Sequence, residues 1–231
     1  KSKILIQNPR EAFYLAEHDF FINGHLKTRR CIFATIRLTP WVHHDVRPHE
    51  WTMPGPKSER LLLRSTVRAD ISPIMSVIPD HTGLLADIFE KFEHISPVLE
   101  GSDVNGDVHR LWIIDDASKT RTLAQLLSAE PIYIADGHHR YESALEHCSQ
   151  AAALSRNNWT GEEPENFVLM GLIPASDPGL VIGPTHRIIH TQSVSNIKTK
   201  LAASFNIRPC NATEPTALLD EISQPSPGIT S

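Results

Sequence analysis

The sequence predicts an α+β (mixed α/β) fold in which helices flank a mixed sheet. Strand-like and helix-like segments alternate irregularly along the 231 residues, and the composition is that of a globular protein, with 40% hydrophobic and 21% charged residues. We expect a single domain over residues 1–221, followed by a flexible tail over residues 222–231 that is rich in Pro and Ser.

Six segments rich in aromatic and β-branched residues predict the strands. In chain order they are Ala12–Glu17, Cys31–Leu38, Ile71–Ile78, Val108–Ile114, Ile132–Ala135 and Phe167–Ile173.

Six further segments predict helices. In Thr82–Ile95, the residues Leu85, Phe89 and Phe92 recur at helical spacing, so one face of this helix is apolar. The other predicted helices are Ser58–Thr66, Thr120–Ser128, His138–Ala153, Ser195–Phe205 and Glu214–Ile222.

The long polar loop Thr39–Pro56 is where we expect functional residues, because sites concentrate on such loops.

Charge and cysteine content exclude several classes of protein. A net charge of −5 argues against a general nucleic-acid binder, and no apolar run approaches the roughly 20 residues of a membrane helix. Cys31, Cys148 and Cys210 are widely spaced and odd in number, which does not suit a disulfide framework. With no secretory signal visible, we expect reduced thiols and a cytoplasmic location.

The segment Pro131–Leu145, PIYIADGHHRYESAL, is the most informative one. A short strand leads into Asp136 and Gly137, and His138, His139 and Arg140 then fall in the first turn of a helix. A helix N-terminus favours anions, and Arg offers a planar fork that matches phosphate oxygens. We therefore favour an anion site here over the alternative, in which Asp136 caps the helix and the basic residues are only solvated.

Two other His-Arg pairs could serve the same pocket. His109-Arg110 lies in a predicted strand, and His186-Arg187 follows Gly183-Pro184-Thr185. For the second pair, an exposed turn leading into a strand is an equal alternative, and the sequence leaves the two open.

The segment Arg47–Arg60, RPHEWTMPGPKSER, supplies the candidate chemistry. Glu50 beside His49 suits a general base, and Lys57 and Arg60 suit the stabilisation of charge on a transferred group. The alternative is a solvated loop stiffened by prolines.

Known metal and nucleotide motifs are missing from the sequence. It has no H-E-x-x-H, Walker A, G-x-G-x-x-G or G-x-S-x-G motif, so we expect no structural metal site. Mg²⁺ carried in by a nucleotide is the better candidate, held by Asp136 or Glu50, because this ion prefers carboxylate and phosphate oxygens.

Four motifs in order resemble the bacterial and archaeal family called domain of unknown function 1015. They are the HE-x-T core within Arg47–Arg60, His109-Arg110-Leu111-Trp112, Ile134–Leu145 and Asp177–Arg187. The resemblance runs from about Phe13 to about His190. It implies a further N-terminal stretch that this chain does not contain.

The Asp-Gly-His-His-Arg segment also resembles the phosphate-binding turn of the ParB/sulfiredoxin superfamily, which includes an archaeal free serine kinase. This implies a ParB/sulfiredoxin-like core in which Gly137, His138, His139 and Arg140 contact phosphate. By analogy Glu50 would activate a substrate hydroxyl, although no motif match carries that role over directly.

The leading hypothesis is a nucleotide-dependent phosphotransferase acting on a small, serine-like hydroxyl metabolite. It would use ATP or ADP with Mg²⁺, and a homodimer is a possible assembly. In this hypothesis Glu50 and Asp136 are catalytic, and His49, Thr52, His109 and Arg110 bind substrate. The phosphate-binding residues are Gly137, His138, His139, Arg140, Lys57, Arg60, His186 and Arg187. A non-catalytic nucleotide or metabolite sensor is the alternative, and a DNA-associated module is disfavoured by the charge.

Overall fold

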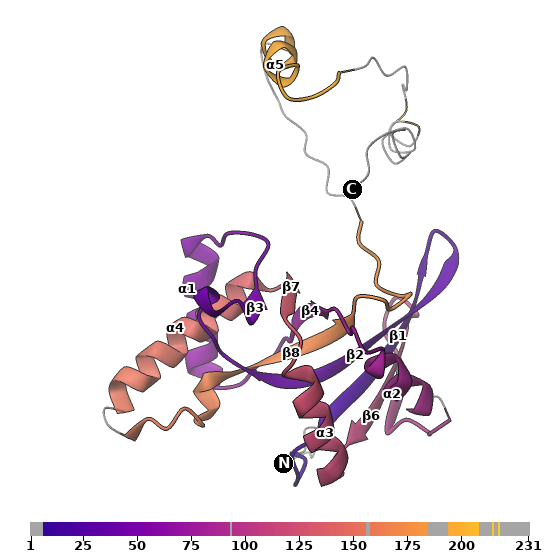
Figure 1. Ribbon diagram of the computed structural model, residues 1–231, viewed down its shortest axis with the longest axis vertical. Helices are drawn as coiled ribbons and strands as arrows, with labels where there is room; N and C mark the ends of the chain where they lie inside the picture. Colours follow the sequence, from indigo (N-terminus) through magenta and orange to yellow (C-terminus); the bar gives the residue numbers. More distant parts are fainter. Residues whose placement is uncertain are drawn as a thin grey trace. The chain divides into compact units, whose positions relative to one another are not determined.

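A computed structural model describes residues 7–92, 94–155, 158–183 and 194–207, together with Glu214 and Ala217 (Figure 1). The chain divides into two compact units, Lys1–Ile182 and Gly183–Ser231, and each is treated by itself. Within the second unit the structure describes one helix, α5 (Val194–Leu201), which matches the helix predicted from Ser195. The predicted helix Glu214–Ile222 lies outside the described residues except for Glu214 and Ala217.

The first unit contains a mixed eight-stranded sheet with the strand order β3-β7-β4-β8-β2-β1-β6-β5. The pairs β3–β7 and β4–β8 are parallel, whereas the other neighbours are antiparallel. The predicted mixed sheet is therefore confirmed. Its strands are β1 (Phe13–Ile22), β2 (His25–Arg37), β3 (Val46–Arg47), β4 (Ile74–Ile78), β5 (Leu99–Ser102), β6 (Val108–Ile114), β7 (Ile132–Asp136) and β8 (Phe167–Pro174).

The β1–β2 hairpin is longer than the sequence patterns predict. Its two-residue turn consists of Asn23 and Gly24, both with positive φ, which is the backbone that closes a tight hairpin with the correct twist. Both strands continue through polar residues to this turn beyond their predicted limits, because each residue has a partner directly across the ladder, as Asp19 has Thr28. The ends of these strands therefore follow from cross-strand pairing rather than from hydrophobic alternation.

The helices of the first unit confirm the predicted ones in place and order. They are α1 (Pro54–Val67), α2 (Leu84–Phe92), α3 (Ala117–Leu127) and α4 (His138–Ser155), with short 3₁₀ turns at Trp41–His43 and Pro164–Asn166. Helix α1 begins four residues earlier than expected, since Pro54 and Pro56 suit the first turn of a helix.

The core lies between the sheet and its helices. Helices α1 and α4 pack on each other, and α4 contacts β4 and β8 (Figure 1). Consecutive residues of β8, from Met170 to Ile173, are all buried, which requires cover on both faces of that strand. One hydrophobic cluster joins these strands to α2, α3 and α4, and among its fully buried members are Leu15, Ile32, Ile74, Met170 and Leu172.

The segment after β8 is fastened to the hairpin by an aspartate and a glycine. The side chain of Asp177 is 1% exposed, and its Oδ2 accepts a hydrogen bond from Arg30 Nε at 3.1 Å. Its Oδ1 accepts one from the amide of Gly179 at 2.9 Å. Gly179 approaches β2 so closely that a Cβ there would lie 2.1 Å from the carbonyl oxygen of Thr28. We call Asp177–Gly179 the DPG anchor.

Candidate functional site

The predicted strand–turn–helix junction is present at the end of β7. The strand ends at Asp136, the chain turns at Gly137 with φ of +108°, and α4 begins at His138. A glycine suits this turn because residues with a side chain rarely adopt such a φ. A Cβ on Gly137 would also lie 3.0 Å from the guanidinium of Arg140.

Two adjacent histidines fasten the loop Pro48–Met53 to the first turn of α4. His138 Nε2 accepts a hydrogen bond from the amide of His49 at 3.2 Å, and His139 Nε2 accepts one from the amide of Met53 at 3.0 Å. A nitrogen that accepts a hydrogen bond carries a lone pair, so both rings are neutral with the proton on Nδ1.

A third fastening comes from Glu142, one turn further along α4. Its carboxylate accepts a hydrogen bond from the Thr52 hydroxyl and lies 3.8 Å from Lys57 Nζ. The loop is thereby held at both ends and in the middle. The predicted substrate-binding residue Thr52 thus has a partner within the protein.

The centre of the site is the pair formed by Glu50 and His138. His138 is 1% exposed, and its otherwise unpartnered Nδ1 lies 3.1 Å from Glu50 Oε1, while the Glu50 side chain is 54% exposed. Burial, and next the nearby ring of His49, lower the pKa of His138, which keeps the ring neutral. The nitrogen that carries the proton is therefore the one that lies beside the Glu50 carboxylate.

The ring of His49 is held by a contact with strand β7. Its Nδ1 lies 2.8 Å from the carbonyl oxygen of Ile134 in β7, and its ring meets that of His138 edge-on at 4.5 Å. Because a carbonyl only accepts, Nδ1 is the donor of this hydrogen bond. The structure therefore brings together three predicted residues, His49, Glu50 and His138.

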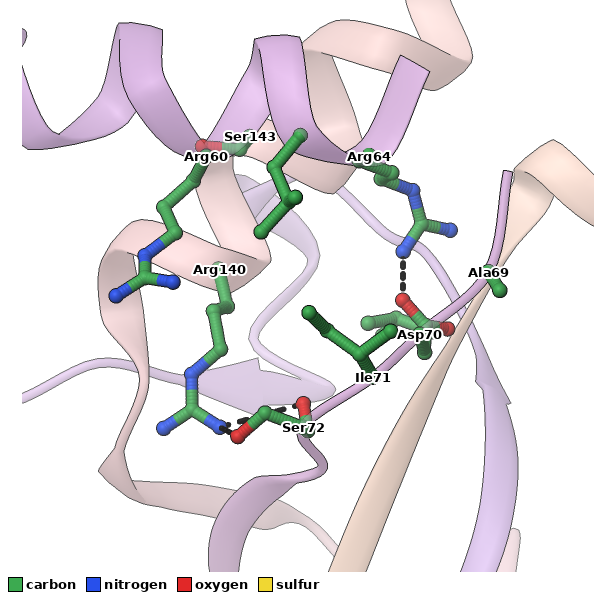
Figure 2. Close-up of a pocket in the computed structure, with 10 residues that line it drawn as sticks. Arg60, Arg64, Ala69, Asp70, Ile71, Ser72, Arg140 and Ser143 are labelled. Carbon is green, nitrogen blue, oxygen red and sulfur yellow. Dashed lines mark hydrogen bonds and ion pairs between the residues drawn. The ribbon is translucent and has the colours of Figure 1, made fainter. Parts of the chain in front are cut away.

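Arg140 and Arg60 meet in a different pocket, between α1, α4 and the segment that precedes β4. Figure 2 shows both guanidinium groups on one side of this pocket. Arg140 contacts Asp136 at 2.5 Å and the Ser72 hydroxyl at 2.9 Å, and it donates to the carbonyl of Pro73. Within the described part of the chain, Arg60 forms no ion pair, so it is a candidate cation for an anionic ligand.

The two groups of residues lie on different sides of the same helical turn. Residues of an α-helix advance by about 100° each, so Arg140 projects about 200° away from His138. The amides of this first turn point out of the N-terminal end of α4, where the helix dipole favours an anion.

The strand order separates two other predicted residues from this junction. His109 and Arg110 lie on β6, five strand spacings from β7, which corresponds to about 24 Å. There His109 stacks on His18, with the ring centres 4.3 Å apart, and Arg110 pairs with Asp19 at 2.6 Å and Glu100 at 2.8 Å. His186 and Arg187 lie outside the described residues.

Two contributors were not predicted from the sequence. Glu142 lies four residues after His138 and therefore on the same helix face, which is a signal the sequence contains. Ser72 gives no such signal, because it reaches Arg140 only through the packing of the segment before β4.

The donor set of two imidazoles and one carboxylate suits a transition-metal ion better than Mg²⁺. One ligand atom from each of His49, Glu50 and His138 lies within 4.8 Å of the others. However, His138 Nδ1 carries the proton as long as Nε2 accepts from the His49 amide, so a metal bound there would break that hydrogen bond. The carboxylates of Glu50 and Asp136 offer the oxygen ligands that Mg²⁺ prefers.

The buried histidines predict a loss of stability in mild acid. Burial is the main cause that lowers the pKa of His138 and of His147, with Arg64 contributing at His147. The unfolded chain takes up a proton at each ring near pH 6.5, while the folded chain does not, so stability present above pH 6.5 is lost as the pH falls. We expect a loss of up to about 1.4 kcal/mol per pH unit for each ring.

Urea unfolding from about pH 7.5 to 5.5 measures this slope. His147→Gln is expected to reduce the slope, and the matched variant of exposed His43, His43→Gln, is expected to leave it unchanged. A free energy of unfolding that stays constant over this range would contradict the neutral state of both rings.

Comparison with known proteins identifies the family. A family model described as "Protein of unknown function (DUF1015)" matches residues 1–226, so the chain belongs to the DUF1015 family. No curated protein and no solved structure matched the chain. Within the described residues, no helix is long and apolar enough to cross a membrane.

Proposed function

We propose that this member of the DUF1015 family is a nucleotide-dependent phosphotransferase that acts on the hydroxyl group of a small, serine-like metabolite. The observation that supports it most is the carboxylate of Glu50, held 3.1 Å from the buried neutral ring of His138 beside the N-terminus of α4. A general base next to an anion-binding helix end is what phosphoryl transfer to a hydroxyl requires.

In this proposal Glu50 accepts the proton of the substrate hydroxyl. His138 is a positioning residue, because its Nδ1–H fixes the carboxylate without contacting substrate. His49 lies beside Glu50, and its Nε2 is directed away from the hydrogen bond with Ile134 and would contact the substrate.

The phosphates of the donor are assigned to the other side of the turn. Arg60, Arg140 and the first amides of α4 would bind and neutralise them. Lys57 lies one turn earlier on α1, 3.8 Å from Glu142, and would add positive charge from outside this pocket. Mg²⁺, when bound with ATP or ADP, would supply further charge neutralisation, with Asp136 or Glu50 as its protein ligand. A ParB/sulfiredoxin-like core is part of this proposal and rests on the sequence resemblance alone.

A non-catalytic sensor is the second candidate, favoured by the contacts of Arg140. This side chain already bridges Asp136 to Ser72 and Pro73. A phosphate that displaced Asp136 would change the link between α4 and the segment before β4. Such a coupling would report binding without any need for Glu50.

Turnover of Glu50→Gln separates the two candidates. The assay contains ATP or ADP, Mg²⁺ and a panel of amino acids that carry a hydroxyl group. We expect the rate of this variant to fall about 10²- to 10⁴-fold, because glutamine keeps the size and shape of the side chain but cannot accept the proton. Glu59→Gln, at an exposed position of α1, is the matched control and should retain the wild-type rate.

The outcomes of this assay are distinct. Wild-type turnover in Glu50→Gln would remove Glu50 from the mechanism and with it the proposal. Nucleotide binding without turnover in any form, wild type included, would favour the sensor.

A further inference from the structure

His138 directs a buried ring nitrogen at the candidate base without forming a hydrogen bond to it. The side chain is 1% exposed, and Nδ1 lies 3.1 Å from Glu50 Oε1 but lacks the alignment of a hydrogen bond. Buried polar atoms almost always have a partner, so this nitrogen requires an explanation. Its neighbours suggest that a metal ion is that partner.

The distance between these two atoms is that of two ligands on one ion. Nitrogen and oxygen atoms bound at about 2.1 Å to a tetrahedral or octahedral ion lie about 3.0–3.4 Å apart. His49 supplies a third donor, since one ligand atom from each of the three residues lies within 4.8 Å of the others. Two imidazoles and one carboxylate are a donor set typical of divalent transition metals.

The ring of His49 has the outer contact that a metal-bound histidine usually makes. Its Nδ1 lies 2.8 Å from the carbonyl oxygen of Ile134, which leaves Nε2 as the nitrogen available to an ion. Histidine ligands commonly donate their second N–H to a carbonyl or a carboxylate, and this contact fixes the ring. His49 and Glu50 are both exposed, so an ion can reach them from solvent while His138 binds it from the interior.

We propose that His49, Glu50 and His138 bind a divalent transition-metal ion such as Zn²⁺, and that this ion inhibits the protein by occupying the candidate base. The site itself is independent of the proposed function, whereas the inhibition rests on it. A cation bound to a carboxylate stabilises its charged form, so Glu50 could no longer accept the proton of a substrate hydroxyl.

Metal binding changes the tautomer of His138. For Nδ1 to ligate the ion, the ring proton moves from Nδ1 to Nε2, which then faces the His49 amide 3.2 Å away as a second donor. The hydrogen bond to the loop backbone is lost, and the bonds from the ion to His49 and Glu50 hold the loop in its place. The metal-bound form and the form with a free base are therefore mutually exclusive.

Binding of Co²⁺ and Zn²⁺ to the untagged protein tests the proposal. Wild type is expected to bind one Co²⁺ per chain at this site, with visible absorption but without a thiolate charge-transfer band, because no cysteine is among the ligands. Glu50→Gln and His49→Ala are each expected to raise the dissociation constant more than about 10-fold, since loss of an outer partner alone costs about 10- to 100-fold.

The matched control is His43→Ala, at an exposed histidine of the preceding 3₁₀ turn, which should bind as wild type does. Circular dichroism spectra that match wild type would show that the ligand variants keep the fold. Excess Mg²⁺ should leave Zn²⁺ binding unchanged, because imidazole nitrogens favour transition metals. Wild-type affinity in both ligand variants, a thiolate band, or displacement of Zn²⁺ by an equal concentration of Mg²⁺ would each overturn the proposal.

The outcome is separable from that of the proposed function. Turnover that depends on Glu50 and is abolished by buffered free Zn²⁺ in excess Mg²⁺ would support both. Zn²⁺ binding that needs the three residues, with no turnover in any form, would keep the metal site and remove the phosphotransferase. Turnover that depends on Glu50 but is unchanged by saturating Zn²⁺ would keep the phosphotransferase and overturn the inhibition.

Discussion

Replacing Gly179 with alanine is expected to destabilise the first unit by about 3 kcal/mol or more. The new Cβ would lie 2.1 Å from the carbonyl oxygen of Thr28 and 2.5 Å from the Cα of Arg29. Both atoms belong to the backbone of β2, which is held at these two positions by its pairing with β1. The DPG anchor must therefore detach, and the buried carboxylate of Asp177 then loses the Gly179 amide as a donor.

Urea or thermal unfolding followed by circular dichroism measures this effect. Gly101→Ala is the matched control, since Gly101 lies in edge strand β5 with no atom within 4 Å of the added Cβ, and we expect its stability to be close to wild type. Similar stability of Gly179→Ala and Gly101→Ala would show that the anchor does not hold the segment as the structure has it.

Removing the ring of His138 is expected to cost about 2–4 kcal/mol. His138→Ala leaves a cavity and a His49 amide without its acceptor, and it frees the loop that carries Glu50. His138→Gln places an amide oxygen near the position of Nε2, so it should recover part of this stability. His138→Asn places its amide nearer to Nδ1 and should recover less.

The same urea titrations, with exposed His43→Ala as the reference, test this order of stability. The result that would contradict the structure is a His138→Ala protein as stable as His43→Ala. An Asn variant more stable than the Gln variant would mean that the contact with Glu50, rather than the one with the loop backbone, holds the ring.

Local patterns predicted the elements whose side chains repeat regularly. The strand Val108–Ile114 was predicted with its observed limits, and α4 begins at His138 as expected. The two-residue strand β3 and the exposed strand β5 were missed, because neither has a hydrophobic pattern of its own and both exist only through pairing with a neighbour. The order of the strands depends on contacts between distant segments, which no local pattern contains.

The contacts of the candidate site also join distant segments, so local patterns did not predict them. Glu50 and the turn at Gly137 were identified from residue type and position, but the partner of Glu50 is 88 residues away and became visible only in the structure. The structure also gives the His138 side chain two contacts that the resemblance did not imply. Its Nε2 is occupied by a backbone amide, and its Nδ1 is directed at a carboxylate, so the ring holds the loop and the base in place.

The DPG anchor also lies at a particular place in the sequence, between the last strand of the sheet and the start of the second unit. The last strand of the sheet ends at Pro174. Two contacts then hold the chain: the Ala175 amide donates a hydrogen bond to the carbonyl of Ile78, and Asp177 forms an ion pair with Arg30. The second unit begins after them, at Gly183. A protease that cuts after Ile182 would sever no strand and none of these bonds. The catalytic candidates Glu50 and Asp136 and all eight strands thus belong to the unit that ends at Ile182.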